Sequence, residues 1–131
     1  MSASRHAGRF GYNYPEKATE GPCYRVMGSF FMVKAADWVR CGGMDPATFL
    51  YSEEAILSER MKGIGRQVWY YPSVSVLHEH GATIGKYYDK VKVREMKFRS
   101  DCYYYRTYIG TPRWQIAIAR LTYFIKKLFG R

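Results

Sequence analysis

The sequence predicts an α/β fold that combines a short mixed sheet, one helix that begins with two carboxylates, and two long amphipathic helices at the C-terminal end. Short β-prone runs alternate with glycine turns in the first 80 residues, a helix start follows Asp45-Pro46, and apolar residues recur at helical spacing beyond residue 83. A chain of 131 residues suits one domain but is short for an enzyme that holds two substrates. We therefore expect part of a larger fold.

The net charge indicates which classes of partner to expect, and the cysteine content indicates the cellular compartment. The formal net charge of +10 favours an anionic partner, such as nucleic acid, an acidic membrane surface or a phosphorylated substrate. Three cysteines without a Cys-x-x-Cys pair argue against a disulfide framework or a zinc site and indicate reduced thiols in the cytoplasm. The polar stretch from Ser2 to Thr19 predicts no signal peptide at this end.

The first 43 residues predict an arm, a strand and a short helix. Glycine and proline among polar residues predict an irregular arm over residues 1–25. Val26 to Val33 is an apolar run typical of a buried strand, in which Gly28 lets a ligand or another backbone come close. Lys34 to Arg40 predicts a short helix that ends at Gly42-Gly43, because glycine readily adopts the left-handed cap conformation.

The next helix is predicted from Glu53 to about Lys62, with Ser52 as its N-cap. The helix dipole should lower the pKa of the two glutamates and keep them ionised at pH 7. At 100° per residue the helix has two neighbouring stripes: Glu54, Leu57, Ser58 and Met61 on one, and Glu53, Leu57, Arg60 and Ile64 on the other. One carboxylate can then face a cleft while the other is tied into the protein.

Two β-prone runs follow, Arg66 to Tyr71 and Ser73 to Leu77, and the second ends at His78-x-His80. These histidines fit a metal or phosphate site, and they fit a surface or capping pair equally well; His78 is the stronger candidate because it comes first after the run. Helical periodicity predicts a long helix from about residue 84 to 105 and another from Arg113 to about Phe129.

The last helix is too short and too charged to span a bilayer. One face collects large apolar side chains: Trp114, Ile118, Leu121, Ile125 and Leu128. Three uses of this face are open, namely packing onto the domain core, lying on an anionic membrane, and binding nucleic acid. Packing onto the domain core is the leading interpretation of the three, and nucleic acid is the weakest, because no nucleic-acid-binding motif is present.

The adjacent glutamates have two interpretations. A carboxylate at a helix start can take a proton from an incoming hydroxyl while its neighbour orients the surrounding network. The same pair can also compensate the helix dipole, worth about 0.3 to 1 kcal/mol, and Glu-Glu alone favours this plainer interpretation.

The residues around the two glutamates favour the catalytic interpretation of the pair. The residues concerned are Gly28-x-Phe30-x-Met32-Val33, Gly42-Gly43-Met44-Asp45, Phe49-Leu50-Tyr51-x-Glu53-Glu54-x-x-Leu57-x-x-Arg60-x-x-Gly63-x-Gly65, Tyr71-Pro72 and His78. In order and spacing, from about Gly28 to Gly81, they resemble the C-terminal half of family-2 glycosyltransferases with the GT-A fold. The resemblance implies a partial GT-A-like fragment that transfers a sugar from a nucleotide-diphosphate sugar to an acceptor hydroxyl, commonly with inversion. The acceptor would be a carbohydrate or a lipid-linked chain, as in polysaccharide biosynthesis at the cell envelope.

The resemblance also assigns roles. Glu54 would be the general base, with Glu53 and Arg60 as its supporting network. His78 would approach the metal or the diphosphate. The acceptor side would be formed by Tyr51, Gly28, Phe30, Gly43 and Asp45. The family pair is usually Glu-Asp, so Glu54 is one methylene longer, and Ile56 stands where relatives often have a further Asp.

Under this resemblance three units are expected: the arm over residues 1–25, the acceptor-side half over 26–82, and a helical extension over 83–131. The Asp-x-Asp motif and most ligands of a Mg²⁺ or Mn²⁺ ion would belong to a half that precedes Met1, so the fragment alone should be inactive. We expect peripheral contact with the inner face of an anionic membrane, no nucleic acid, and self-association through faces exposed by truncation. The alternatives are a noncatalytic basic module that binds a membrane surface or an acidic polymer, and an interaction domain completed by a partner chain.

Overall fold

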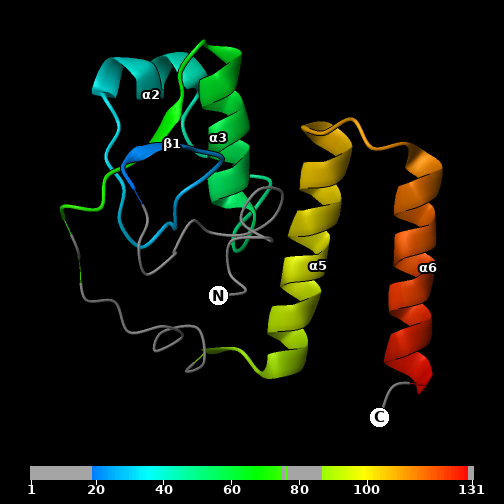
Figure 1. The fold of residues 1–131 in the computed structure, drawn as a ribbon. Helices are drawn as coiled ribbons and strands as arrows, with labels where there is room; N and C mark the ends of the chain where they lie inside the picture. Colours follow the sequence, from blue (N-terminus) through cyan, green and yellow to red (C-terminus); the bar gives the residue numbers. More distant parts are fainter. Residues whose placement is uncertain (1–18, 75, 77–86, 130–131) are drawn as a thin grey trace.

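The computed structural model describes residues 19–74, 76 and 87–129. The elements in this part of the chain are β1 (Gly21–Cys23), α2 (Ala35–Cys41), α3 (Glu53–Gly63), β2 (Val68–Tyr70), α5 (Lys90–Thr107) and α6 (Arg113–Phe129). The predicted α/β class is confirmed. Figure 1 shows α2, α3 and the sheet grouped together, with α5 beside α3 and α6 outermost against α5.

The sheet of the described residues is a two-stranded antiparallel pair, not a mixed sheet. Pro22 lies opposite Trp69 in the register. Proline is tolerated there because each strand of a two-stranded sheet has one edge that needs no partner. The arm predicted as irregular up to residue 25 therefore contributes β1, which pairs with β2 of the next predicted unit. The candidate strand around Ser73 is a turn where it is described, and its remainder lies outside the described residues.

The prediction of a buried strand from Val26 to Val33 is wrong. It runs as irregular chain with a turn at Gly28-Ser29, and the side chains of Phe30 and Met32 are 51% and 86% exposed. An apolar run becomes a strand only when a neighbouring strand accepts its backbone hydrogen bonds, and the described part of this chain offers it none. The run instead borders a groove above α3.

Helix α2 ends as predicted. Gly42 adopts the left-handed conformation with φ 78°, and its N–H contributes to the closing bonds with the carbonyls of Trp38 and Val39. Gly43 also has a positive φ, and a Cβ there would lie 3.0 Å from the Trp38 ring. The turn thus requires glycine at both positions for different reasons, backbone conformation at Gly42 and close packing as well at Gly43.

Helix α3 begins at Glu53 as predicted, but Ser52 does not cap it in the predicted way. Ser52 lies in the left-handed region, and its hydroxyl donates to Asp101 Oδ1 of α5 at 2.7 Å. A tertiary contact has therefore replaced the local cap.

The two C-terminal helices are present, with α5 starting later than its periodicity predicts. Asp89 sets the start, because its carboxylate accepts the backbone N–H of Lys92 as an N-cap. Residues 84–86 lie outside the described part. Helix α6 has the predicted bounds. Among the described residues, no helix combines the length and the apolar character needed to cross a membrane.

The core lies between α3 and α5 and is rich in tyrosine. Ala55, Ile56 and Tyr104 are buried, and four further tyrosines pack around them. The hydroxyl of Tyr24, just after β1, donates to Glu59 Oε1 at 2.8 Å and also bonds the hydroxyl of Tyr104. Phenolic rings can fill such a core because each hydroxyl finds a polar partner. The helical extension therefore supplies one wall of the core.

Replacing Ile56 by alanine tests this core. Ile56 is 0% exposed, so Ile56→Ala should lower the free energy of unfolding by about 2–5 kcal/mol in a urea titration followed by circular dichroism. Val39→Ala is the matched control, since Val39 is 75% exposed and should change the value by no more than about 0.5 kcal/mol. Equal effects of the two substitutions would contradict the position of the core.

Candidate functional site

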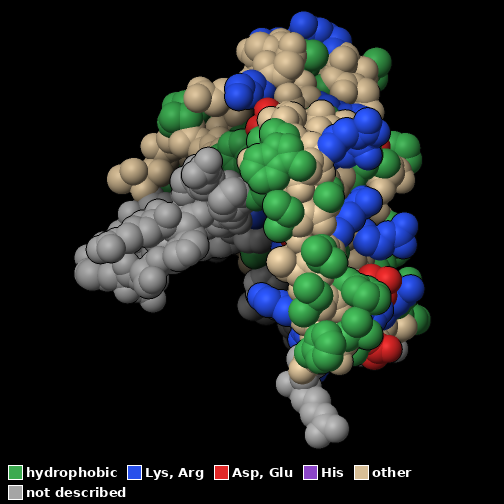
Figure 2. All heavy atoms as spheres, turned by 90° about the vertical axis from the view of Figure 1, so that its right-hand side faces the viewer, with side chains coloured by type: hydrophobic (Ala, Val, Ile, Leu, Met, Phe, Trp, Pro, Cys, Tyr) green, Lys and Arg blue, Asp and Glu red, His purple; other side chains and the backbone are tan. Residues whose placement is uncertain are grey.

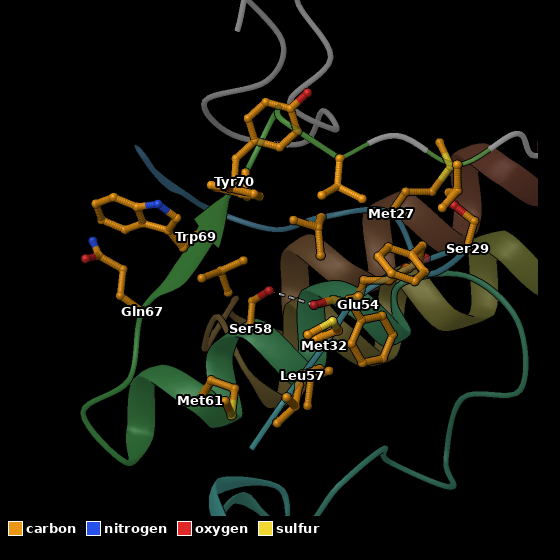
Figure 3. Close-up of a pocket in the computed structure, with 18 residues that line it drawn as sticks. Met27, Ser29, Met32, Glu54, Leu57, Ser58, Met61, Gln67, Trp69 and Tyr70 are labelled. Carbon is orange, nitrogen blue, oxygen red and sulfur yellow. Dashed lines mark hydrogen bonds between the residues drawn. The ribbon is translucent and has the colours of Figure 1, made fainter. Parts of the chain in front are cut away.

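A groove with a volume of about 870 Å³ opens between α3, the irregular segment from Val26 to Val33, and β2 with the chain that follows it (Figure 3). Its floor is one side of α3, and its walls are largely apolar and aromatic. The sequence reasoning missed several lining residues, among them Met27, Trp69 and Tyr70. The apolar run and the β-prone run were the available signals, but only the fold shows that they face each other.

The floor of the groove confirms one predicted helical stripe. Glu54, Leu57, Ser58 and Met61 all line the groove from α3. Ser58 Oγ donates to the Glu54 backbone carbonyl at 2.7 Å, which is the dashed line in Figure 3. This stripe places one carboxylate in an otherwise apolar groove.

Glu54 is held there by the backbone of Gly28. Its Oε1 accepts the Gly28 N–H at 2.9 Å, whereas its Oε2 is buried and has no hydrogen-bond partner among the described residues. A Cβ at position 28 would lie 2.6 Å from Oε1, so the contact depends on glycine. One oxygen is therefore positioned by a backbone N–H, and the other is enclosed by the protein without a described partner.

The neighbouring Glu53 does not line the groove, although its Oε2 is likewise buried without a hydrogen-bond partner among the described residues. Burial raises the pKa of the Glu53 carboxyl above its usual value, and the charge of Glu54 raises it further, while its own backbone N–H and Arg25 lower it. The expectation that the helix dipole lowers the pKa of both glutamates is thus wrong for Glu53, because desolvation outweighs the dipole.

Arg60 and Asp45 lie in a second, separate cluster with Tyr103 of α5 and with Tyr108, the C-cap residue of that helix. Asp45 Oδ2 accepts the hydroxyls of Tyr108 at 2.5 Å and Tyr103 at 2.9 Å, and it pairs with Arg60 at 3.2 Å. Asp45 Oδ1 accepts the Ala47 N–H at 2.9 Å. Arg60 donates to the Gly42 and Gly43 carbonyls at 2.9 and 3.0 Å and to Tyr108. This polar cluster joins the glycine turn, α3 and α5.

The polar cluster fixes the ionisation of Asp45. Burial alone would raise the pKa of the Asp45 carboxyl, but the hydrogen bonds from Tyr108, the Ala47 N–H and Tyr103, together with the charge of Arg60, outweigh it and lower the pKa. A carboxylate with so many internal partners acts as a structural anchor.

Tyr51 lies at the start of α3, away from the lining of the groove. Tyr51 and Ser52 both have positive φ values, 69° and 65°, a conformation that costs about 1–3 kcal/mol at each non-glycine residue. Helix α5 supports this turn: Ser100 Oγ donates to the Leu50 carbonyl at 2.7 Å, and Asp101 accepts from Ser52. The turn fixes where α3 begins and hence where Glu54 lies.

The predicted site residues thus divide into separate groups. Gly28, Phe30 and Glu54 meet at the groove. Gly43, Asp45 and Arg60 meet in the polar cluster, and Glu54 and Arg60 are six residues apart on α3, or about 9 Å along its axis. His78 lies outside the described residues. Within the described ranges, no three His, Cys, Asp or Glu side chains gather closely enough to hold a metal ion.

Comparison with known proteins adds no assignment. No family model, curated protein or solved structure matches this chain. The geometry of the groove and the motif resemblance are therefore the two indications of function that this chain offers.

The polar cluster predicts a pH-dependent stability. Asp45→Asn should lower the free energy of unfolding by about 1–3 kcal/mol near neutral pH, since Arg60 loses its buried counter-ion. The pKa of Asp45 in the native protein lies below its value in the unfolded chain, which is about 4. The ionised Asp45 therefore contributes fully to the free energy of unfolding above about pH 4, and this contribution is lost as the pH falls through the native pKa. Urea unfolding at a series of pH values measures the difference from wild type.

Asp89→Asn is the control for this series, because asparagine caps a helix about as well as aspartate. Its difference from wild type should be small near neutral pH. A difference for Asp45→Asn that stays constant from neutral pH to about pH 3 would contradict the lowered pKa.

Proposed function

We propose that this chain is the acceptor-side part of an inverting, family-2-like glycosyltransferase that uses a nucleotide-diphosphate sugar. The observation that carries the proposal is the Glu54 carboxylate: it lies in an apolar groove, one oxygen is positioned by the Gly28 N–H, and the other oxygen is buried without a described partner. The dipole-compensation alternative does not require such a placement, because a glutamate that only compensates a helix end can remain in solvent.

In the proposed reaction an acceptor hydroxyl lies in the groove against Glu54. The hydroxyl oxygen attacks the anomeric carbon while its proton passes to the Glu54 carboxylate, and the bond to the nucleoside diphosphate breaks with the electron pair leaving on the diphosphate. Attack opposite to the leaving group inverts the anomeric centre. The aromatic walls suit the apolar face of a sugar ring and limit the access of water.

Two features support a role as part of a larger fold. The segment from Val26 to Val33 has strand-like composition but no strand partner among the described residues, and it exposes Phe30 and Met32 beside the groove. Further strands at this edge would complete the sheet and cover these side chains. The described residues contain no metal-binding cluster. We propose that these further strands also bind the diphosphate and the Mg²⁺ or Mn²⁺ ion.

Glu54→Gln tests the general base. The substitution keeps the shape of the side chain but removes its ability to accept a proton at pH 7, so turnover should fall by about 10²–10⁴-fold. The assay uses the longest natural polypeptide that contains these residues and measures nucleoside diphosphate released from a panel of nucleotide sugars with a carbohydrate or lipid-linked acceptor fraction.

Glu59→Gln is the matched control on the same helix. Glu59 accepts the Tyr24 hydroxyl, a bond that the glutamine oxygen can keep, and it does not line the groove. Its activity should remain near wild type. A Glu54→Gln protein of normal turnover would refute the base, and a wild-type protein that consumes none of the donors would refute the proposed class.

Gly28→Ala tests the positioning of Glu54 independently. The new Cβ would occupy the place of Oε1, and because the carboxylate is the end of a flexible side chain, it should swing away with little change in melting temperature. We expect turnover to fall by up to about 10²-fold, as for a displacement of about 1 Å. Gly63→Ala, where a Cβ meets nothing within 4 Å, should retain full turnover. Equal turnover of the two variants would show that the hydrogen bond from the Gly28 N–H to Glu54 is not needed for activity.

A further inference from the structure

Helix α6 has two opposite faces, and among the described residues one face packs on α5 while the other keeps its apolar side chains exposed. The inner face packs on α5: Ile116 is buried, the rings of Tyr123 and Phe98 stack with centroids 4.0 Å apart, and Lys127 pairs with Glu95 at 3.7 Å. The outer face keeps its large apolar side chains between 44% and 62% exposed; they are Trp114, Ile118, Leu121, Phe124, Ile125 and Leu128. Packing of this face onto the domain core, one of the three uses open from the sequence, is therefore wrong.

The outer face is continuous and bordered by positive charge. At 100° per residue its six side chains span an arc of about 120°. Arg113 and Arg120 lie beside one border, Lys126 and the Glu95-paired Lys127 lie farther round the helix, and α6 contains no Asp or Glu. Figure 2 looks onto this side of the molecule and shows hydrophobic side chains along its length with Lys and Arg beside them.

We propose that the outer face of α6 docks onto an anionic lipid bilayer, with the helix parallel to the membrane surface. An arc of this width, rich in Trp, Phe and Leu and flanked by Lys and Arg, matches the requirements of an interfacial helix: the apolar side chains enter the boundary between headgroups and acyl chains, and the basic ones meet acidic headgroups. Over 17 residues the helix offers a contact about 25 Å long.

The charge pattern favours lipid over a second copy of the chain. Trp114, Ile118, Leu121, Ile125 and Leu128 alternate by four and three residues, as in a coiled-coil seam. The positions beside such a seam are Gln115, Ala117, Thr122, Phe124 and Phe129, which offer no opposite charges that would select a second copy, whereas the basic residues of α6 complement acidic headgroups. An anionic bilayer accommodates the apolar face and the basic side chains at once.

Vesicle flotation of the 131-residue chain tests this proposal. The chain should float with vesicles of phosphatidylcholine and phosphatidylglycerol, bind more weakly as salt rises, and bind pure phosphatidylcholine poorly. Leu121→Glu, at an exposed position, should weaken binding by at least about tenfold without changing the fold. Gln115→Glu adds the same charge to α6 outside the arc and should bind nearly as the wild type does. Trp emission should shift to shorter wavelength on binding, and Trp114→Phe should abolish the shift.

Three results would overturn the proposal. The first is equal binding to neutral and anionic vesicles, and the second is an equal loss of binding in Leu121→Glu and Gln115→Glu. The third is a lipid-free dimer, seen by sedimentation velocity, that Leu121→Glu dissociates. Such a dimer would assign the outer face of α6 to a second copy of the chain. None of these measurements uses a nucleotide sugar. Failure here is therefore distinguishable from failure of the Glu54 proposal.

Discussion

The ion pair between the buried Asp45 and the partly buried Arg60 is the contact on which the rest of the structure depends. It joins three elements that are distant in sequence, since Arg60 bonds the carbonyls of the glycine turn and Asp45 accepts two tyrosine hydroxyls from α5 and its C-cap. A buried ion pair is stabilising only when its remaining polar atoms also find partners, and here the tyrosines and the Ala47 N–H supply them. By fixing α3 against both α2 and α5, the pair determines the orientation of the helix that carries Glu54.

This arrangement changes the role of residues that the sequence groups into one site. Arg60 and Asp45 are close to Glu54 in the motif, yet their side chains are fully engaged about two helical turns away, so they act on the groove through the position of α3. The strained turn at Tyr51-Ser52 acts in the same way, because α5 holds it where α3 must begin. Positioning of the groove carboxylate is thus shared between a rigid anchor on one side of α3 and the Gly28 backbone on the other.

Local signals in the sequence predict the elements well, and non-local contacts account for the errors. Gly42 ends α2, and the bounds of α6 follow from its periodicity and the proline before it, because these features depend on neighbours within a turn or two. Val26 to Val33 fails as a strand since pairing requires a partner that composition cannot supply. Ser52 has the residue type of an N-cap, but its hydroxyl finds Asp101, 49 positions along the chain. Periodicity likewise reveals that α6 is amphipathic without revealing which side α5 covers.

The described part of the chain exposes two apolar surfaces, the groove and the outer face of α6, and the polar groups beside each surface indicate a different kind of partner. The groove is lined by the Glu54 carboxylate, so filling it with lipid chains would desolvate a charge at high cost, whereas a hydroxylated ligand can hydrogen-bond the carboxylate. The outer face of α6 has no carboxylate and is bordered by basic side chains, which is the pattern that acidic headgroups accept. Because α5 separates α3 from α6, a membrane can dock on α6 without covering the groove, and the groove can receive an acceptor while the helix remains attached.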